Sequence, residues 1–383
     1  MNKQQGMSLV GLMVGIFVGL LVALAVAGTA SFMESQRRMS TGANGAMSNA
    51  ANGMFLIEKV VRQAGLGLMV PGGFACPGLN LANGGTVRSD GGAVYPVSVV
   101  DGGTGPDQIT IAYLDTLLSA APPRLLLPQA TADSAFRIAN SDGIVSGTLL
   151  LLQDASALQP CTLMQVSAVT AAAVGADIVH TGGPTNTASS SFSTPVAYLD
   201  NAKAAPANAF RWLTYRVNTS PASPNYLALE EVDNSTGAVT VVAEDVVSMQ
   251  AQYGLVPPLG SVAAPLDSVI SWTDATGAWA APSATDMLRV RAVRLAIVAR
   301  SQDRDHTAAN ACSATSANQS ATRYRNLVAW TGKAPAVDPS AANPEQDGPT
   351  IDLATAAGDN WCHYRYRSVN LMLPLLNVRM GLR

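Results

Sequence analysis

The residues able to act as acids, bases or metal ligands are thinly scattered along this 383-residue chain. None of the three histidines, His180, His306 and His363, has the H-E-x-x-H spacing that holds zinc. No nucleophile elbow of the G-x-S-x-G type and no Gly-rich phosphate loop is present. In the run Asp303-Arg-Asp305-His306 two carboxylates lie close enough to bind a hard cation, but the Gly-containing loop and distal Glu of an EF-hand are missing. We therefore expect no enzyme, no cofactor and no metal, and we interpret Asp303 and Asp305 as part of a solvated loop.

Arginine is the other chemically notable residue, because it is concentrated in the last hundred positions. These are Arg289, Arg291, Arg294, Arg300, Arg323, Arg325, Arg365, Arg367, Arg379 and Arg383. Nearby tyrosines could stack nucleic-acid bases, yet the formal net charge of the whole chain is -3. We favour arginines on the solvent face of strands, paired with the acidic loop residues Asp338, Glu345, Asp347 and Asp352. No nucleic-acid partner is expected.

The composition indicates a large core and many turns. Hydrophobic residues make up 48% of the chain and charged residues only 13%, and there are 33 glycines and 22 prolines. Four cysteines, Cys76, Cys161, Cys312 and Cys362, form an even set without the C-x-x-C spacing of a zinc site. Outside the cytosol, disulfides are the better interpretation, and more than one pairing is open.

The N-terminus joins a short basic leader to an apolar helix. Lys3-Gln-Gln-Gly6 runs directly into Met7, and no residue from Met7 to Met33 is charged. As a helix this segment would be roughly 40 Å long, enough to cross a membrane. A secretory signal peptide has its cleavage site after the apolar core, and a plain anchor needs no Gly at this point. The junction resembles the processing site of a type IV prepilin.

That resemblance implies cleavage between Gly6 and Met7 by prepilin peptidase and N-methylation of Met7. Pilins usually carry Glu at the fifth mature position, and this chain departs from the pattern with Gly11. Gly11 also begins a row of small residues every four positions, the spacing that lets membrane helices pack closely. The row consists of Gly11, Gly15, Gly19, Ala23 and Ala27. In a pilin it would face neighbouring helices, although Gly and Ala are also simply tolerated in membrane spans.

Helical periodicity continues beyond the apolar segment. Apolar residues recur every three or four positions up to Ala64, so we expect one long helix from about Ser8 to Ala64 with Gly65 as its C-cap. Gly42, Gly45 and Gly53 are expected to loosen it. Its end, Arg62-Gln-Ala-Gly65, is typical of PilW-type minor pilins.

Beyond Gly65 the chain has the pattern of short strands and long loops. Predicted strands span Gln108–Tyr113, Thr148–Leu152, Thr162–Val169, Phe210–Val217, Tyr226–Glu231, Ala238–Ala243 and Val246–Tyr253. Thr181–Thr194 and Lys333–Thr350 are expected to be surface loops. Val293, Leu295 and Ile297 alternate with Arg294 and Ala296, which predicts a half-buried strand.

Three C-terminal segments follow in the order found in PilW-type proteins: Val246–Gly254, Val290–Ser301 and Tyr364–Asn377. With the junction and the helix end, they make the chain resemble a PilW-type minor pilin over nearly its whole length. The implied fold is α+β and pilin-like, with a long N-terminal helix packed on a large, mostly antiparallel β domain. Expected divisions are a cleaved leader (1–6), a membrane or filament-core half-helix (7–33), an amphipathic half-helix (34–65) and a periplasmic domain (66–383). Among the cysteine pairings we favour Cys76 with Cys161 and Cys312 with Cys362, because pilins often staple a C-terminal loop.

The resemblance implies a single-pass inner-membrane protein with its globular part in the periplasm. It would later join the pilus, at the tip. Expected partners are other minor pilins, the major pilin, prepilin peptidase, the inner-membrane assembly platform and a large tip adhesin. The alternatives are a pseudopilin of a type II secretion system and, from another class, a signal-anchored periplasmic binding protein or adhesin with nucleic-acid or surface affinity. Loss of twitching motility rather than loss of secretion would separate the first two.

Mass spectrometry of the mature N-terminus tests the processing site. We expect the chain purified from its own membrane to begin with N-methylated Met7, because the Gly6–Met7 bond is the predicted cleavage position. A chain that retains Met1 would contradict the prepilin interpretation and would favour the signal-anchored alternative.

Overall fold

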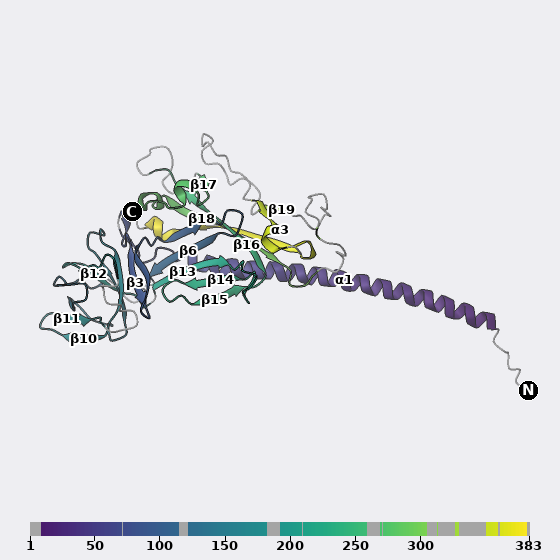
Figure 1. The fold of residues 1–383 in the computed structure, drawn as a ribbon, viewed down its shortest axis with the longest axis horizontal. Helices are drawn as coiled ribbons and strands as arrows, with labels where there is room; N and C mark the ends of the chain where they lie inside the picture. Colours follow the sequence, from purple (N-terminus) through teal and green to yellow (C-terminus); the bar gives the residue numbers. More distant parts are fainter. Residues whose placement is uncertain are drawn as a thin grey trace, which may run out of the picture.

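A computed structural model shows a long helix that projects from a β-rich body (Figure 1). It describes residues 9–70, 72–114, 122–181, 192–208, 210–258, 269, 271–304, 312, 326–328, 350–358 and 361–380. The α+β arrangement expected from the sequence is confirmed, since one long apolar helix precedes a mostly antiparallel β domain.

Helix α1 (Leu9–Val61) is continuous over 53 residues, which corresponds to about 80 Å. The expected loosening at its glycines is wrong, because the helix runs through all three. Gly53 instead permits close packing, since a Cβ there would lie 2.8 Å from Leu229 Cδ2. The helix ends three residues before the predicted Ala64. The chain continues in turns to Gly65, whose φ of +78° favours glycine and whose N–H donates to Ala112 O at 2.9 Å.

Two antiparallel sheets receive the C-terminal half of α1. The first has the strand order β15-β14-β13-β6-β5, and the second has the order β17-β16-β18-β21. Their strands are β5 (Val97–Val100), β6 (Gln108–Leu114), β13 (Phe210–Val217), β14 (Leu229–Asp233), β15 (Val239–Ala243), β16 (Val246–Leu255), β17 (Ser271–Thr273), β18 (Val290–Arg300) and β21 (Tyr366–Pro374). Helix and sheets share one hydrophobic core, to which α1 contributes Ala50, Met54, Ile57 and Val61.

Strand β18 differs from its prediction. The expected alternation is present, but both faces are buried rather than one. Val293, Leu295 and Ile297 face the core under α1, whereas Ala296 and Val298 belong to a second cluster around Trp361 on the opposite face. Packing on both sides therefore leaves Arg294 only 7% exposed, with its guanidinium carbon 5.8 Å from the centre of the Trp272 ring.

A second region lies at the end of the body far from the N-terminus (Figure 1). Its described part consists of residues 122–181 and 192–208, which lie in the chain between the paired strands β6 and β13, together with the preceding β3 and β4. Its sheets have the orders β12-β8-β9-β3-β4 and β10-β11-β7. The strands are β3 (Leu79–Asn83), β4 (Thr86–Gly92), β7 (Phe136–Ile138), β8 (Leu149–Gln153), β9 (Cys161–Gln165), β10 (Ala168–Ala171), β11 (Ala176–Val179) and β12 (Lys203–Pro206). The single strand predicted at Thr162–Val169 is thus two, β9 and β10.

Short elements complete the described chain. They are β1 (Met69–Val70), β2 (Gly73–Phe74), η2 (Gly277–Trp279), α2 (Ala284–Met287), β19 (Asn326–Val328), β20 (Thr350–Asp352), α3 (Leu353–Ala357), η3 (Trp361–His363) and α4 (Leu376–Met380). Most of the two predicted loops lies outside the described residues.

Asp107 joins the two sheets at a buried point. Its Oδ1 accepts from Gly102 N at 2.9 Å and its Oδ2 from Ala251 N at 2.7 Å, while its own N–H donates to Met249 O at 2.8 Å. The residue is only 4% exposed. Burial raises the pKa of Asp107 to about 6, partly opposed by the hydrogen bonds from Gly102 and Ala251.

Replacement of Asp107 by Asn should remove a pH dependence of stability. The pKa of Asp107 is higher in the folded chain than in the unfolded chain. The stability that this residue contributes is therefore fully present below its pKa in the unfolded chain and is lost as pH rises through about 6. We expect the free energy of unfolding of Asp107→Asn minus that of the wild type to increase between pH 4 and pH 7. Thermal unfolding of both full-length chains in detergent measures this difference, and titration of other groups cancels in it. A difference that stays constant with pH would contradict the assignment.

Candidate functional site

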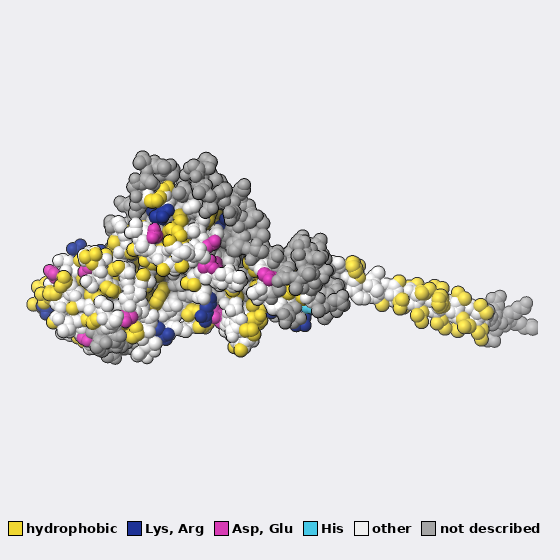
Figure 2. Space-filling view, turned by 45° about the horizontal axis from the view of Figure 1, so that its top comes forward, with side chains coloured by type: hydrophobic (Ala, Val, Ile, Leu, Met, Phe, Trp, Pro, Cys, Tyr) yellow, Lys and Arg dark blue, Asp and Glu magenta, His cyan; other side chains and the backbone are white. Residues whose placement is uncertain are grey.

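The projecting half of α1 is an uncovered apolar surface. From Leu9 to Phe32 its side chains are exposed, including Leu9 at 74% and Phe17 at 66%. Figure 2 shows these hydrophobic side chains along the helix beyond the body. By length and composition this part of α1 is able to cross a membrane. Water is an unfavourable environment for so much apolar area, so this surface must be covered by lipid or protein.

The predicted small residues lie on this exposed helix. Gly11, Gly15 and Gly19 are exposed, and a Cβ built on any of them would have no neighbour within 4 Å. Their spacing of four places them near one face of α1. They therefore leave room for close approach by another helix. The processing residues Gly6 and Met7 lie outside the described residues.

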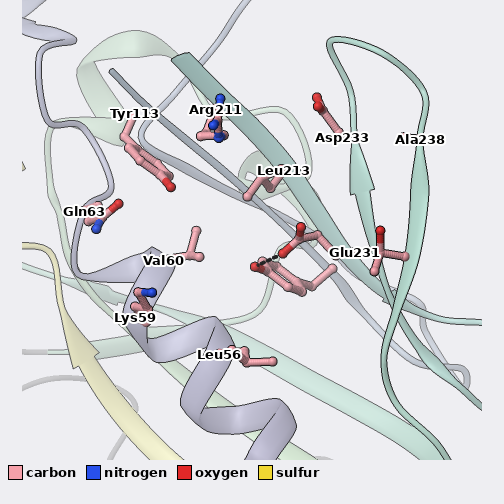
Figure 3. Close-up of a pocket in the computed structure, with 12 residues that line it drawn as sticks. Leu56, Lys59, Val60, Gln63, Tyr113, Arg211, Leu213, Glu231, Asp233 and Ala238 are labelled. Carbon is pink, nitrogen blue, oxygen red and sulfur yellow. Dashed lines mark hydrogen bonds between the residues drawn. The ribbon is translucent and has the colours of Figure 1, made fainter. Parts of the chain in front are cut away.

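A groove of about 690 Å³ lies where α1 meets the first sheet (Figure 3). A helix is roughly 10 Å wide and strands are about 4.8 Å apart, so α1 cannot cover all five strands. Leu56 and Val60 form its helical side, and Leu213 and Tyr215 of β13 form its floor. Lys59, Gln63, Tyr113, Arg211, Glu231, Asp233, Ala238 and Thr240 complete the lining.

Two carboxylates of the groove accept hydrogen bonds from neighbouring residues. Tyr215 Oη donates to Glu231 Oε2 at 2.5 Å, drawn as a dashed line in Figure 3. Burial, this bond and the charge of Glu231 together raise the pKa of Tyr215. Asp233 accepts from the backbone and the hydroxyl of Ser235. Glu231 of β14 is thus bonded to the neighbouring strand β13, and Asp233 is bonded to the turn that follows β14. The described lining of the groove includes no Ser, Cys or His.

Both cysteine pairs are joined in the structure. Cys76 is bonded to Cys161 and Cys312 to Cys362, which is the pairing favoured from the sequence. The first bond connects the segment before β3 with β9 and so ties the inserted residues to the body. The second lies beside His363, and these three side chains are the one possible metal-ligand group found among the described residues. Since both sulfurs are bonded to each other, they are not available as thiolate ligands.

Of the two weak cation candidates, Asp303 is the one that lies among the described residues. Asp303 is exposed, its backbone oxygen accepts from Ser301 Oγ at 2.9 Å, and Asp305 lies outside the described residues. The interpretation of the arginines needs correction. Arg291 and Arg294 are 8% and 7% exposed, because both faces of β18 are packed. Arg300 pairs with Asp245 at 2.9 Å; of the predicted acidic partners, Asp338, Glu345 and Asp347 lie outside the described residues.

The groove and the buried bridge at Asp107 were missed from the sequence. The apolar period of α1 identifies its core face, but it does not show which strands end beside Leu56 and Val60. For Asp107, the only sequence signal is an Asp directly before a predicted strand.

Comparison with known families gives one match. Residues 214–377 match the family described as Type IV Pilus-assembly protein W, PilW. The match begins in β13 and ends in α4, so it includes the whole second sheet and excludes α1 and the inserted residues 122–208. Comparisons with curated proteins and with solved structures found nothing that matches.

Removal of the first disulfide should destabilise the body. In the chain-entropy view, the bond restricts the unfolded chain over a separation of 85 residues, so Cys76→Ser with Cys161→Ser should lower the free energy of unfolding by about 4 kcal/mol. Denaturant unfolding of the full chain, followed by limited proteolysis, measures the effect. Cys312→Ser with Cys362→Ser is the matched control and should leave residues 122–208 as resistant to protease as in the wild type. If residues 122–208 resist protease equally well with and without the Cys76–Cys161 bond, then that bond does not attach them to the body.

Proposed function

We propose that the chain, of which residues 214–377 match the PilW family, is a minor pilin of the type IV pilus that helps to initiate pilus assembly and lies in a tip complex. The observation that carries this proposal is the combination of a PilW-type sheet with a helix whose apolar half has no partner within the described chain. A helix of this kind suits a subunit that is first held in the membrane and then packed among other helices. We assign no reaction to the groove or to any other cluster.

The residue at position 11 favours the tip over the shaft. In pilins the usual Glu at this place neutralises the N-terminal amine of a neighbouring subunit, and an isolated charge in an apolar environment costs several kcal/mol. Gly11 cannot supply that carboxylate. It offers close packing instead, because its position on α1 is open and without a side chain. A subunit of this kind is a poor repeating unit but is tolerated where the contact is not required.

The proposal includes the processing and location of the chain. Residues 1–6 are a leader removed by prepilin peptidase, residues 7–33 are held first in the inner membrane and then in the filament core, and the rest is periplasmic. Residues 34–65 and 66–383 form the amphipathic half-helix and the globular domain. The partners are other minor pilins, the major pilin, the inner-membrane assembly platform and a large tip adhesin.

Copurification from cells that make pili tests this function. The wild-type full chain should isolate with other minor pilins, and Gly11→Glu should change its place, increasing its incorporation into sheared filaments because the missing carboxylate is restored. Gly11→Gln is the matched control, since it adds similar bulk without charge and should not increase incorporation. Absence of other minor pilins from the wild-type complex would overturn the proposal. Unchanged filament content in Gly11→Glu would overturn the tip assignment.

A further inference from the structure

A second pocket, of about 430 Å³, lies between the short strands β1 and β2 and the ends of β8 and β12. Figure 1 shows β12 at the end of the body far from the N-terminus. One wall of the pocket is mainly apolar and the other is polar. The lining includes Val70, Phe74 and Ala75 on the first wall, and Gln153, Asp154 and Lys203 on the second. Its volume is typical of a small-molecule site.

Two polar side chains reach this pocket from one face of a sheet. Gln153 ends β8 and is paired with Lys203, the first residue of β12. Residues that are directly paired project from the same face. Leu151 and Ala205, the next pair on that face, belong to one hydrophobic cluster with Ala75. The side chains of Gln153 and Lys203 therefore project toward the segment that contains Ala75.

The amide of Gln153 is buried without a partner. The residue is 5% exposed, and its Nε2 has no hydrogen bond to any described residue. Buried polar groups in folded proteins are nearly always hydrogen-bonded, because an unpaired one has lost its water without compensation. A ligand that accepts a hydrogen bond in the pocket would supply the missing partner.

Two cations on the same face also lack a counterion. Lys203 is half-buried, and Arg124 lies directly opposite it in an isolated antiparallel bridge on the outer side of β12. Neither side chain forms an ion pair with a described carboxylate. Like charges at paired positions of a sheet repel each other. An anion beside Lys203 would offset this repulsion.

Asp154, the carboxylate in the lining, is bonded within its own turn. Its Oδ2 accepts from Ser156 Oγ and from Leu158 N, the latter at 3.2 Å. No ion pair joins it to a described cation. The polar wall thus offers hydrogen-bond donors and positive charge, whereas the opposite wall offers Val70 and Phe74. An anionic group attached to an apolar body fits both walls.

We propose that this pocket binds a small organic carboxylate. The carboxylate accepts hydrogen bonds from Lys203 and Gln153 and lies near Arg124, and the apolar part of the ligand packs against Val70 and Phe74. A neutral ligand would leave the two cations without a counterion, and an inorganic anion would leave the apolar wall uncovered. The site goes beyond the proposed pilus function and does not depend on it, since α1 contributes no residue to its lining.

Isothermal titration of the full chain in detergent tests the proposal. The probe is N-acetylleucine, which joins a carboxylate to an apolar side chain. We expect it to bind saturably, and we expect N-acetylleucinamide, which lacks the charge, to bind about tenfold more weakly. Inorganic phosphate, which lacks the apolar part, should also bind more weakly. This comparison is made on the wild type and needs no variant.

Substitutions then locate the site. Lys203→Met should lower the affinity for N-acetylleucine about tenfold, whereas Lys203→Arg, which keeps the charge, should retain it within about twofold. Lys59→Met is the matched control, because it removes an exposed cation from the groove beside α1 and should leave the affinity unchanged. Thermal unfolding of each variant beforehand establishes that it is folded.

Gln153→Leu separates a binding role from a structural one. Because the amide has no described partner, an apolar side chain of similar size should leave the melting temperature unchanged or raise it. The same variant should bind N-acetylleucine about fivefold more weakly, since one hydrogen-bond donor is lost. A lower melting temperature with unchanged affinity would show that Gln153 stabilises the fold and binds no ligand.

Four further results would overturn the proposal. They are no saturable binding of N-acetylleucine, equal binding of the acid and the amide, phosphate binding as tight as that of the acid, which indicates an adventitious ion only, and equal affinities of Lys203→Met and Lys59→Met. None of these results bears on copurification with other minor pilins, so the failure of this proposal and the failure of the proposed function are distinguishable.

Discussion

The packing of the C-terminal half of α1 on two sheets is the interaction on which the rest of the structure depends. Ala50, Met54, Ile57 and Val61 fill one stripe of the helix and enter a core built from both sheets. Gly53 allows the helix to approach Leu229 closely, and Asp107 connects the sheets beside the same core. Because this half of α1 is held so firmly, its other half is presented as a rigid projection, able to carry the body on a membrane or a filament.

The same packing limits what α1 can cover. One helix lies over several strands and leaves a groove on the first sheet. In this groove, Glu231 accepts a hydrogen bond from Tyr215 and Asp233 accepts one from Ser235. A low-charge protein with an apolar projection is suited to assembly, in which neighbours supply the missing coverage. The inserted residues 122–208 do not interrupt this arrangement, because β6 and β13 pair across their insertion point and a disulfide ties them to the body.

Local sequence patterns predict the bounds of some helices and strands accurately and those of others poorly. Phe210–Val217 was predicted with the observed bounds, because alternation between a packed and a more open face persists along β13. β9 and β10 were predicted as one strand, since a short break between two similar apolar runs has no strong signal in the sequence. Helical glycines were expected to weaken α1, and tertiary contact at Gly53 instead makes one of them useful. The full burial of β18 could not be foreseen, because alternation does not reveal that a second cluster covers its polar face.

The sequence by itself carries the features that make this chain resemble a PilW-type protein. A charge-free helical segment, the Gly6–Met7 junction, Gly11 in place of Glu, and the C-terminal segments are local features, and each can be identified without knowing what lies nearby in space. The tertiary structure alone decided which strands meet α1, that Asp107 is buried between sheets, and that both faces of β18 are packed. The physical reason is that the spacing of apolar residues along a segment specifies which face of that segment needs a partner. Long-range packing specifies which partner that face finds and which surfaces stay uncovered.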